Sequence, residues 1–321
     1  MSGVARFLLI ALCIAAGLST SASADNYPTK PVRILVGFGA GGSVDLLTRL
    51  IGEKLSKRLG QQFYVENRPG AGTVIATTAL TQASPDGYTL MMADIALSAA
   101  PALVKQLPYD TLHDLVPIVR VASLPSVLAV SSSNPAHTLR EFVNLAKSEP
   151  GKFNYGSAGV GSFLFLAGEL FKSQAGINIE QIPYKSTAEV MLGLARRDVS
   201  LVIAAAPAMM SQRDKLRFLA VSNPTRLDSI PDVPTFAESG MPDFNVQNWQ
   251  GLVAPKGTDP KIIARINKEM NEILNEPEMR ERLSNLGMVV LGGTQMEFQE
   301  FLASEMKRWS KVIKGSISSG K

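Results

Sequence analysis

The stretch Tyr27–Asp45, YPTKPVRILVGFGAGGSVD, decides the fold of this chain. Its segment Val32–Phe38 predicts a buried β-strand, and apolar residues at helical spacing from Val44 to Leu55 predict an amphipathic helix. Glycines at positions 37, 39, 41 and 42 lie between the two. A strand, a glycine loop and a helix N-terminus in this order bring unpaired backbone N–H groups together, and such groups favour an anion.

The residues before this stretch have the pattern of an export signal. Arg6 precedes an apolar run, Phe7–Ala16, and small residues follow it up to Ala24. The run is far shorter than the roughly 20 apolar residues that a membrane-spanning helix needs. We therefore expect a signal peptide at 1–24, cleavage near Ala24 and an exported mature protein that lacks the only cysteine, Cys13.

Length and composition predict two globular domains. With 321 residues, the chain exceeds one ordinary core of roughly 100–200 residues, and 45% hydrophobic residues allow extensive burial. The formal net charge of +4 becomes +3 when Arg6 leaves with the signal. Because basic residues alternate with acidic ones instead of forming a stripe, we expect no nucleic-acid partner.

Strand-like and helix-like segments alternate along the chain, as they do in α/β folds. A Pro-rich segment at 223–242 is expected to be an ordered surface excursion. Strands are predicted at 62–66, 88–93, 118–122, 126–130, 153–156, 180–183, 199–204, 216–221 and 246–254, and helices at 73–82, 139–148, 162–173, 188–196, 260–274, 277–286 and 295–313.

Packing the last helices against the first half of the chain gives two doubly wound lobes with a ligand cleft between them. Lobe 1 is expected at 25–124 and 250–321, and lobe 2 at 125–249. The chain then crosses twice between the lobes. We expect the crossing segments near 121–126 and 246–250 to act as hinges.

The glycine loop admits three interpretations. Gly37, Gly39 and Gly42 match the dinucleotide-binding pattern G-x-G-x-x-G, and Glu66 ends the next strand where a ribose-binding acid is found in that fold. A tight strand-to-helix turn also explains the glycines without any ligand. We favour anion binding, because an exported protein would not ordinarily meet nicotinamide cofactors.

In the favoured interpretation, the loop from Phe38 to Asp45 holds an anion with backbone groups. Gly41 and Gly42 let the backbone approach the ligand, Ser43 caps the helix, and the helix dipole adds a fractional positive charge. Asp45 is expected to stabilise the helix end and to orient the loop, because as a direct ligand group it would repel an anion.

A second loop, Asn154–Ser162 with the sequence NYGSAGVGS, also lies between a predicted strand and a predicted helix. Its candidate binding residues are Ser157, Ala158, Gly159, Gly161 and Ser162. For each residue alone, a cap or a turn is an equally good explanation. Two such loops at corresponding helices of two lobes favour a shared anion site across the cleft.

Signals for catalysis are weak. His113 and His137 lie in predicted loops without metal-ligand spacing, and Gly156–Gly159 is one residue short of the G-x-S-x-G nucleophile motif. We predict no catalytic residue, no metal and no cofactor. An exported α/β enzyme, either a hydrolase using Ser157 or a dehydrogenase using the Gly37–Gly42 loop, remains the alternative to a binding protein.

From Tyr27 to its C-terminus, the chain resembles the substrate-binding receptors of tripartite tricarboxylate transporters, the Bug family. The matching segments are YPTKPVRILV, GGSVD, VENRPGAG, SPDGYTL, LPYD, GSAGVGS, AGELF, PYK, IPDVPTFAESG and APKGT. The resemblance implies a monomeric receptor of the periplasmic-binding-protein type. Such a receptor would work in the periplasm, close on a small organic carboxylate and deliver it to a membrane permease.

Several positions depart from the pattern of the family and bear on the ligand. Phe165 stands where many members have His, Ala204 and Ala205 where many have Asp-Asn, and Val74 where Asn is common. These changes remove polarity and predict a carboxylate with an apolar body, such as an aromatic or medium-chain acid, with Phe165 and Met209 as candidate walls. Asp94, where small hydroxyl residues are common, is expected to accept a proton from a polar ligand group. Ser98 completes the candidate binding set.

Overall fold

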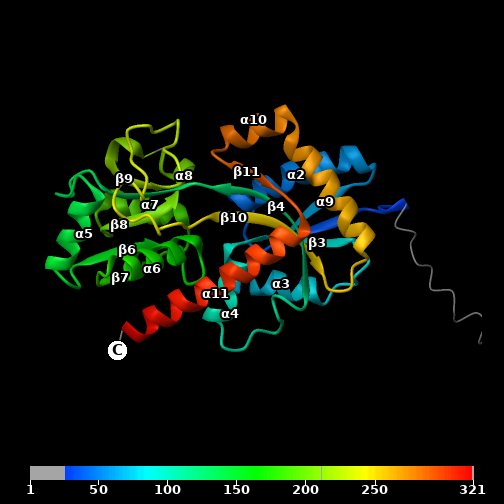
Figure 1. The fold of residues 1–321 in the computed structure, drawn as a ribbon, viewed down its shortest axis with the longest axis horizontal. Coiled ribbons are helices and arrows are strands. Elements are labelled where there is room, and N and C mark those ends of the chain that lie inside the picture. Colours follow the sequence, from blue (N-terminus) through cyan, green and yellow to red (C-terminus); the bar gives the residue numbers. More distant parts are fainter. Residues whose placement is uncertain (1–25, 211, 320–321) are drawn as a thin grey trace, which may run out of the picture.

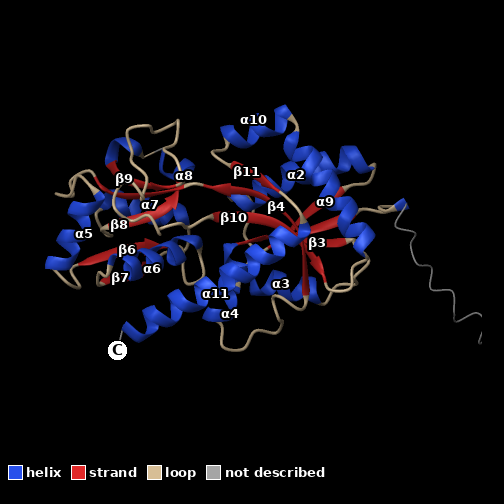
Figure 2. Ribbon diagram, in the orientation of Figure 1, coloured by secondary structure: helices blue, strands red, loops and turns tan. Residues whose placement is uncertain are grey.

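Two α/β lobes lie side by side in the computed structural model, which describes residues 26–210 and 212–319 (Figure 1). The predicted signal peptide and its cleavage site lie outside the described residues. Each lobe is built on one mixed sheet, and helices cover both of its faces (Figure 2). The two-lobed α/β fold expected from the sequence is confirmed.

The first lobe has six strands in the order β11-β4-β10-β3-β1-β2. Strand β1 pairs in parallel with β2 and β3, whereas β10 runs antiparallel between β3 and β4. The strands are β1 (Val32–Val36), β2 (Phe63–Asn67), β3 (Thr89–Asp94), β4 (Leu115–Leu124), β10 (Asn248–Pro255) and β11 (Val289–Gly292).

Alternating residues of these strands bury against helices on opposite faces. Ile34 of β1 packs with the helices on one face, and Leu35 packs with those on the other. The first face carries α2 (Ser43–Leu59), α9 (Pro260–Asn275) and α10 (Pro277–Asn285), and the second carries α3 (Val74–Thr81), α4 (Ile95–Leu103) and α11 (Gln295–Ser319).

The second lobe has five strands in the order β7-β6-β8-β5-β9. Here β6 is parallel to β7 and β8, and β5 is antiparallel to β8 and β9. The strands are β5 (Ser126–Ser131), β6 (Phe153–Ser157), β7 (Ile179–Pro183), β8 (Leu201–Ala205) and β9 (Leu216–Ser222), and the helices are α5 (Leu139–Ser148), α6 (Phe163–Ala175), α7 (Thr187–Arg196) and α8 (Ala206–Met210).

The sheets differ from wholly parallel doubly wound sheets at the strands where the chain crosses between lobes. β4 continues through Pro125 directly into β5, and β10 brings the chain back. A strand that enters one lobe from the other lobe begins at the cleft. β5 and β10 are such strands, so each runs antiparallel to the strands beside it. The crossings therefore make both sheets mixed.

A shared apolar layer joins the two lobes on the α11 side. Residues of α4, α6 and α11 belong to one continuous buried cluster, and α11 contacts both α4 and α6. Trp249 of β10 is fully buried and packs edge-on against Phe298 and Phe301 of α11. This layer therefore packs the two lobes together on the α11 side.

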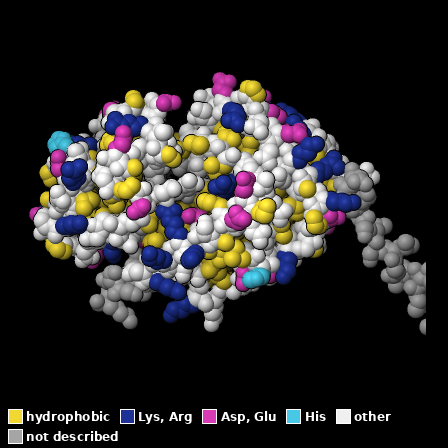
Figure 3. Space-filling model, in the orientation of Figure 1, with side chains coloured by type: hydrophobic (Ala, Val, Ile, Leu, Met, Phe, Trp, Pro, Cys, Tyr) yellow, Lys and Arg dark blue, Asp and Glu magenta, His cyan; other side chains and the backbone are white. Residues whose placement is uncertain are grey.

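The surface carries charges of both signs. Acidic and basic side chains lie close together over much of the face in Figure 3, and basic side chains lie over the C-terminal half of α11. Among the described residues, no helix combines the length and the apolar character needed to cross a bilayer.

Gly251 of β10 tests how tightly the bridging layer is packed. A Cβ atom there would lie 2.5 Å from the ring of Phe298, which is fully buried, and 3.1 Å from the carbonyl oxygen of Val119. We expect Gly251→Ala to lower the free energy of unfolding in urea by about 1–3 kcal/mol. Gly39→Ala is the control, since its Cβ would meet nothing within 4 Å. Equal stability of the two variants would contradict this packing.

Candidate functional site

A cavity of about 520 Å³ lies between the lobes, where both glycine loops reach it. This volume is in the range of small-molecule sites. The first lobe lines the cavity with Phe38, Gly42, Ser43, Val44, Leu46, Asp94, Leu124, Asn248, Leu286 and Met288, and the second lines it with Ala158, Ser162, Phe163, Leu164, Lys185, Ser186, Thr187, Ala205, Pro207 and Ala208.

The first glycine loop ends at the N-terminus of α2. Gly41 has a φ of +85°, a left-handed conformation that favours glycine, and it turns the chain into the helix. The N-cap is Gly42, which has no side-chain cap, and Ser43 is the first helical residue. The expectation that Ser43 caps the helix is therefore wrong. Gly42 and Ser43 instead bring the first amide groups of α2 to the cavity, and those groups have no acceptor within the helix.

Asp45 stabilises this loop through hydrogen bonds that its buried carboxylate accepts, and in this sense it braces the loop. Its side chain is 2% exposed and accepts hydrogen bonds from the amide of Gly41 at 2.9 Å, Nδ2 of Asn67 at 2.9 Å and Nε of Arg49 at 3.0 Å. Burial alone would raise the pKa of Asp45, but the hydrogen bonds from Arg49, Gly41 and Asn67 outweigh it and hold the pKa below its usual value. Asp45 does not line the cavity, so it orients the loop.

The second loop reaches the cavity in the same way. Gly159 and Gly161 have φ angles of +93° and +87°, and Ser162 is the N-cap of α6. The Ser162 hydroxyl accepts from the amide of Phe165 at 3.3 Å and donates to the carbonyl of Gly159 at 2.7 Å. Because this hydroxyl is already used, the backbone amides of the first turn of α6 are the donors left for a ligand.

A third helix begins at the cavity. Ser186 caps α7 by accepting from the amide of Glu189 at 3.3 Å, and the Glu189 carboxylate accepts from the amide of Lys185 at 3.1 Å. This reciprocal arrangement is a capping box. Lys185 is exposed and is the only Lys or Arg among the described residues that line the cavity. The sequence interpretation did not single it out, although it follows a strand of a parallel pair at the edge where ligands bind in such sheets.

The candidate residues fall into two groups. Those that line the cavity are Phe38, Gly42, Ser43, Asp94, Ala158, Ser162 and Ala205. Those that do not line it are Gly41, Asp45, Ser98, Ser157, Gly159, Gly161, Phe165 and Ala204. Their contact with a ligand stays a prediction for both groups.

The expected walls Phe165 and Met209 do not line the cavity. Phe165 is 9% exposed and Met209 is fully buried, and both belong to the core of the second lobe. Phe163 and Leu164, the two residues directly before Phe165 on α6, line the cavity instead. The direction in which a side chain points at a helix start depends on the loop before it, which periodicity does not reveal.

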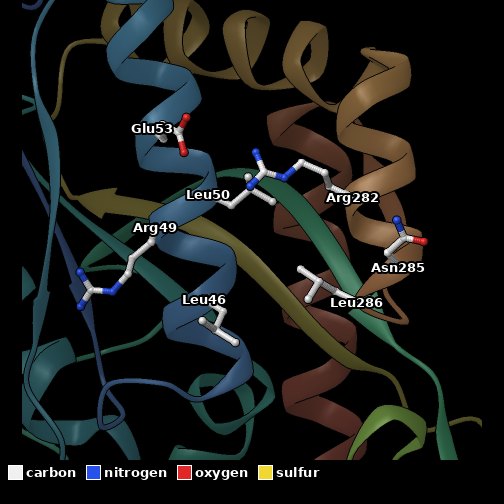
Figure 4. A pocket seen from close by; sticks show the side chains of 7 residues that line it. All are labelled: Leu46, Arg49, Leu50, Glu53, Arg282, Asn285 and Leu286. Atoms are coloured by element: carbon white, nitrogen blue, oxygen red, sulfur yellow. The ribbon is translucent and has the colours of Figure 1, made fainter.

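A second groove, of about 420 Å³, lies between α2 and α10. Figure 4 shows Arg282 of α10 reaching towards α2, whereas Arg49 points away towards the glycine loop. Leu46 and Leu286 line both the groove and the cavity. No glycine loop reaches this groove, so we place the candidate site in the cavity.

The geometry gives no support to the enzyme alternatives. The hydroxyl of Ser157 is fully buried and accepts from Gln181 Nε2 at 2.6 Å, so no base faces it. Glu66, the candidate ribose-binding acid, is paired with Arg33 and Arg68. Among residues 26–210 and 212–319, no three His, Cys, Asp or Glu side chains are grouped to hold a metal ion.

The bracing role of Asp45 predicts a stability change. Asp45→Ala leaves the amides of Gly41 and Asn67 without their acceptor, so we expect the free energy of unfolding to fall by about 1–3 kcal/mol at pH 7. A lowered pKa in the folded state means that the carboxylate stabilises above its unfolded pKa of about 4, and this contribution is lost as the pH falls through the folded value. The difference from wild type should therefore shrink below about pH 4.

Glu53→Ala on the same helix is the matched control. Among the described residues, the Glu53 carboxylate forms its ion pair with the exposed Lys57 alone, so its removal should change the stability by no more than about 0.5 kcal/mol. Denaturant titrations of both variants at a series of pH values measure these effects. Equal losses for the two variants would show that Asp45 does not brace the loop.

Comparison with known proteins identifies the family. The family model described as "Tripartite tricarboxylate transporter family receptor" matches residues 47–317. The chain is 35% identical over 303 residues to the protein BugT of Bordetella pertussis, covering 93% of each chain. These matches span both lobes.

Two solved structures from Rhodopseudomonas palustris resemble the chain over most of its length. Rpa4515 with adipate is 32% identical, with a TM-score of 0.81 and coverage of 90% of this chain and 98% of that one. MatC with bound malate is 29% identical, with a TM-score of 0.79 and coverage of 89% and 100%. Proteins of this family are solute-binding receptors, which decides against the enzyme alternatives. The chain belongs to the family of receptors of tripartite tricarboxylate transporters, the Bug family.

Proposed function

We propose that this receptor binds a small organic carboxylate in the cavity between its lobes and delivers it to a membrane permease from the periplasm. The observation that carries the proposal is the convergence of the α2 and α6 N-termini on one cavity, one from each lobe. A ligand held by both lobes stabilises the closed arrangement, as in hinged binding proteins. The adipate and malate bound by two relatives are both carboxylates, which supports this ligand class.

The donors at the cavity are sufficient for useful affinity. Hydrogen bonds to a charged group contribute about 1.5–3 kcal/mol each. Four such bonds from the first turns of the two helices reach the roughly −8 kcal/mol of a micromolar complex. Lys185 adds a positive charge from the second lobe. A carboxylate therefore needs neither a metal ion nor an arginine clamp.

The rest of the cavity favours an apolar ligand body. Its walls include Val44, Leu124, Phe163, Leu164 and Met288. Burying roughly 150 Å² of apolar ligand surface contributes about 4 kcal/mol at about 25 cal/mol per Å². An aromatic or medium-chain acid fits such walls better than a strongly hydroxylated one, since each unpaired polar group that becomes buried costs about 1–3 kcal/mol.

Closure would rotate one lobe against the other about the crossing strands β4, β5 and β10. This rotation would take place on the side of the molecule that the shared apolar layer leaves open. Trp249 lies in β10 at the crossing and packs against α11. We expect its fluorescence to change when a ligand binds and the strand adjusts. An unchanged signal with a ligand of proven affinity would remove Trp249 from the hinge.

Calorimetric titration tests the ligand class. Purified receptor, freed of copurified ligand by unfolding and refolding, is titrated with benzoate-type acids, adipate, citrate and aspartate. We expect micromolar binding of an aromatic or medium-chain acid and weaker binding of citrate and aspartate. Tight binding of citrate or aspartate alone would refute the apolar ligand body, and binding of no carboxylate would refute the proposed function.

Lys185 provides a site-directed test. We expect Lys185→Gln to weaken binding of the best carboxylate about fivefold, which corresponds to about 1 kcal/mol. Lys147→Gln is the control, because Lys147 is exposed on α5 and does not line the cavity. The two dissociation constants are measured by calorimetry at low and high salt. Equal affinities for the two variants would exclude Lys185 from the site.

A further inference from the structure

Asp94 adds a buried acidic side chain to the cavity, close to the end of β1 where the first glycine loop begins. It is the last residue of β3 and the N-cap of α4, lines the cavity and is only 4% exposed. Its Oδ1 accepts from the amide of Ala96 at 3.1 Å. No Lys, Arg or His among the described residues forms an ion pair with it. This carboxyl group therefore occupies the N-terminus of α4, where the helix dipole favours negative charge.

Gln250 is a buried polar neighbour of Asp94. The two residues are directly opposite in the antiparallel β3–β10 pair, so their side chains project from the same face of the sheet. Gln250 is fully buried, and neither its Nε2 nor its Oε1 has a hydrogen-bond partner within the described chain. Unpaired buried amides are costly and uncommon. Asp94 and Gln250 thus form a polar floor, of which Asp94 lines the cavity and Gln250 does not.

The charges around this floor are few. Lys185 lines the cavity from the second lobe, and on α2 Asp45 is paired with Arg49. β10 contributes the neutral Gln250, α4 has no charged residue, and Glu305 of α11 pairs with Arg308. Burial raises the pKa of Asp94 to about 7, against a smaller lowering by backbone hydrogen bonds. Asp94 therefore accepts hydrogen bonds as a carboxylate above neutral pH and can also donate one below it.

We propose that Asp94 determines specificity, by selecting a carboxylate ligand that also carries a hydrogen-bond donor and by disfavouring a second ionised carboxylate on the ligand. This inference rests on the proposed function, since it assumes that the glycine loops hold the first carboxylate. An ionised Asp94 only accepts hydrogen bonds, as does a second ligand carboxylate, and two like charges repel in a buried site. A hydroxyl group of the ligand supplies the missing donor.

The simpler role of Asp94 is to cap α4. Asp94→Asn separates the two roles, because Asn is as good an N-cap as Asp and is nearly the same size. A purely capping residue predicts unchanged ranking of ligands in this variant. A specificity-determining residue predicts that the ranking changes while the fold stays intact, which circular dichroism and thermal unfolding of the same samples verify.

The experiment compares three acids of one length, hexanoate, 6-hydroxyhexanoate and adipate, by calorimetry on the full receptor at pH 8.5. Four-carbon counterparts, butyrate, 4-hydroxybutyrate and succinate, cover a shorter ligand. We expect the wild type to bind the hydroxy acid at least tenfold more tightly than the diacid of the same length. In Asp94→Asn this ratio should fall at least tenfold, because the amide donates to the second carboxylate.

A second series at pH 6.0 adds a readout that capping does not affect. The wild type should bind the diacid more tightly at pH 6.0 than at pH 8.5, by about tenfold, because protonated Asp94 then donates to it. In Asp94→Asn only the ligand itself still titrates at this site. The difference in diacid affinity between pH 6.0 and pH 8.5 should therefore be smaller in this variant than in the wild type. If carboxylates bind but the ranking and pH dependence are the same in both proteins, the role of Asp94 is refuted alone. If no carboxylate binds to the wild type, the proposed function fails with it.

Discussion

The unpaired amide groups at the start of a helix are the constraint on which this structure depends. Each helix has such groups, and they must be satisfied by a cap, by water or by a ligand. In this receptor, α2, α6 and α7 begin at one cavity. Helix α2 has no side-chain cap, whereas Ser162 and Ser186 each accept a hydrogen bond from one amide of α6 and α7 and leave the other amides of those first turns without an acceptor in the helix. Gly42 has no side chain to offer, and the Ser162 hydroxyl is used within its own loop. The protein thus keeps donors free where an anion can reach both lobes.

The remainder of the fold holds these donors in place, and in the proposed function it also lets them approach a ligand. Asp45 fixes the first loop through three hydrogen bonds, and Ser162 fixes the second. The crossing strands β4, β5 and β10 join the lobes, while α11 and its contact with Trp249 seal one side. Rigid loops on hinged lobes are the arrangement that makes binding depend on closure. We propose that the polar floor at Asp94 then distinguishes among the acids that fit.

Sequence patterns predicted most of the fold because its strands and helices follow their ordinary periods. The unit from Val32 to Leu55 is present as a strand, a loop and a helix. Helix α4 was not predicted, since it is apolar all round and contains Pro101, so it has no helical period to detect. The short edge strand β11, Val289–Gly292, ends in a glycine and was also missed.

The site was predictable in its backbone and less so in its side chains. Glycine positions revealed both loops, because a left-handed turn before a helix leaves few alternatives at Gly41 and Gly161. Phe165 was expected at the wall, but Phe163 lines it, because the approach of the loop sets the rotation of α6. Lys185 lies near the cavity because β7 ends at the cleft, and this position follows from the folded sheet rather than from the sequence around it. A lone lysine gives no sequence signal of its own.

A crystal structure of the receptor with its best-binding carboxylate would test the central claim most directly. The account predicts carboxylate oxygens within hydrogen-bonding distance of backbone amides in the first turns of both α2 and α6, with the lobes closed around the ligand. A ligand in the groove between α2 and α10, or one held by side chains of a single lobe, would contradict it.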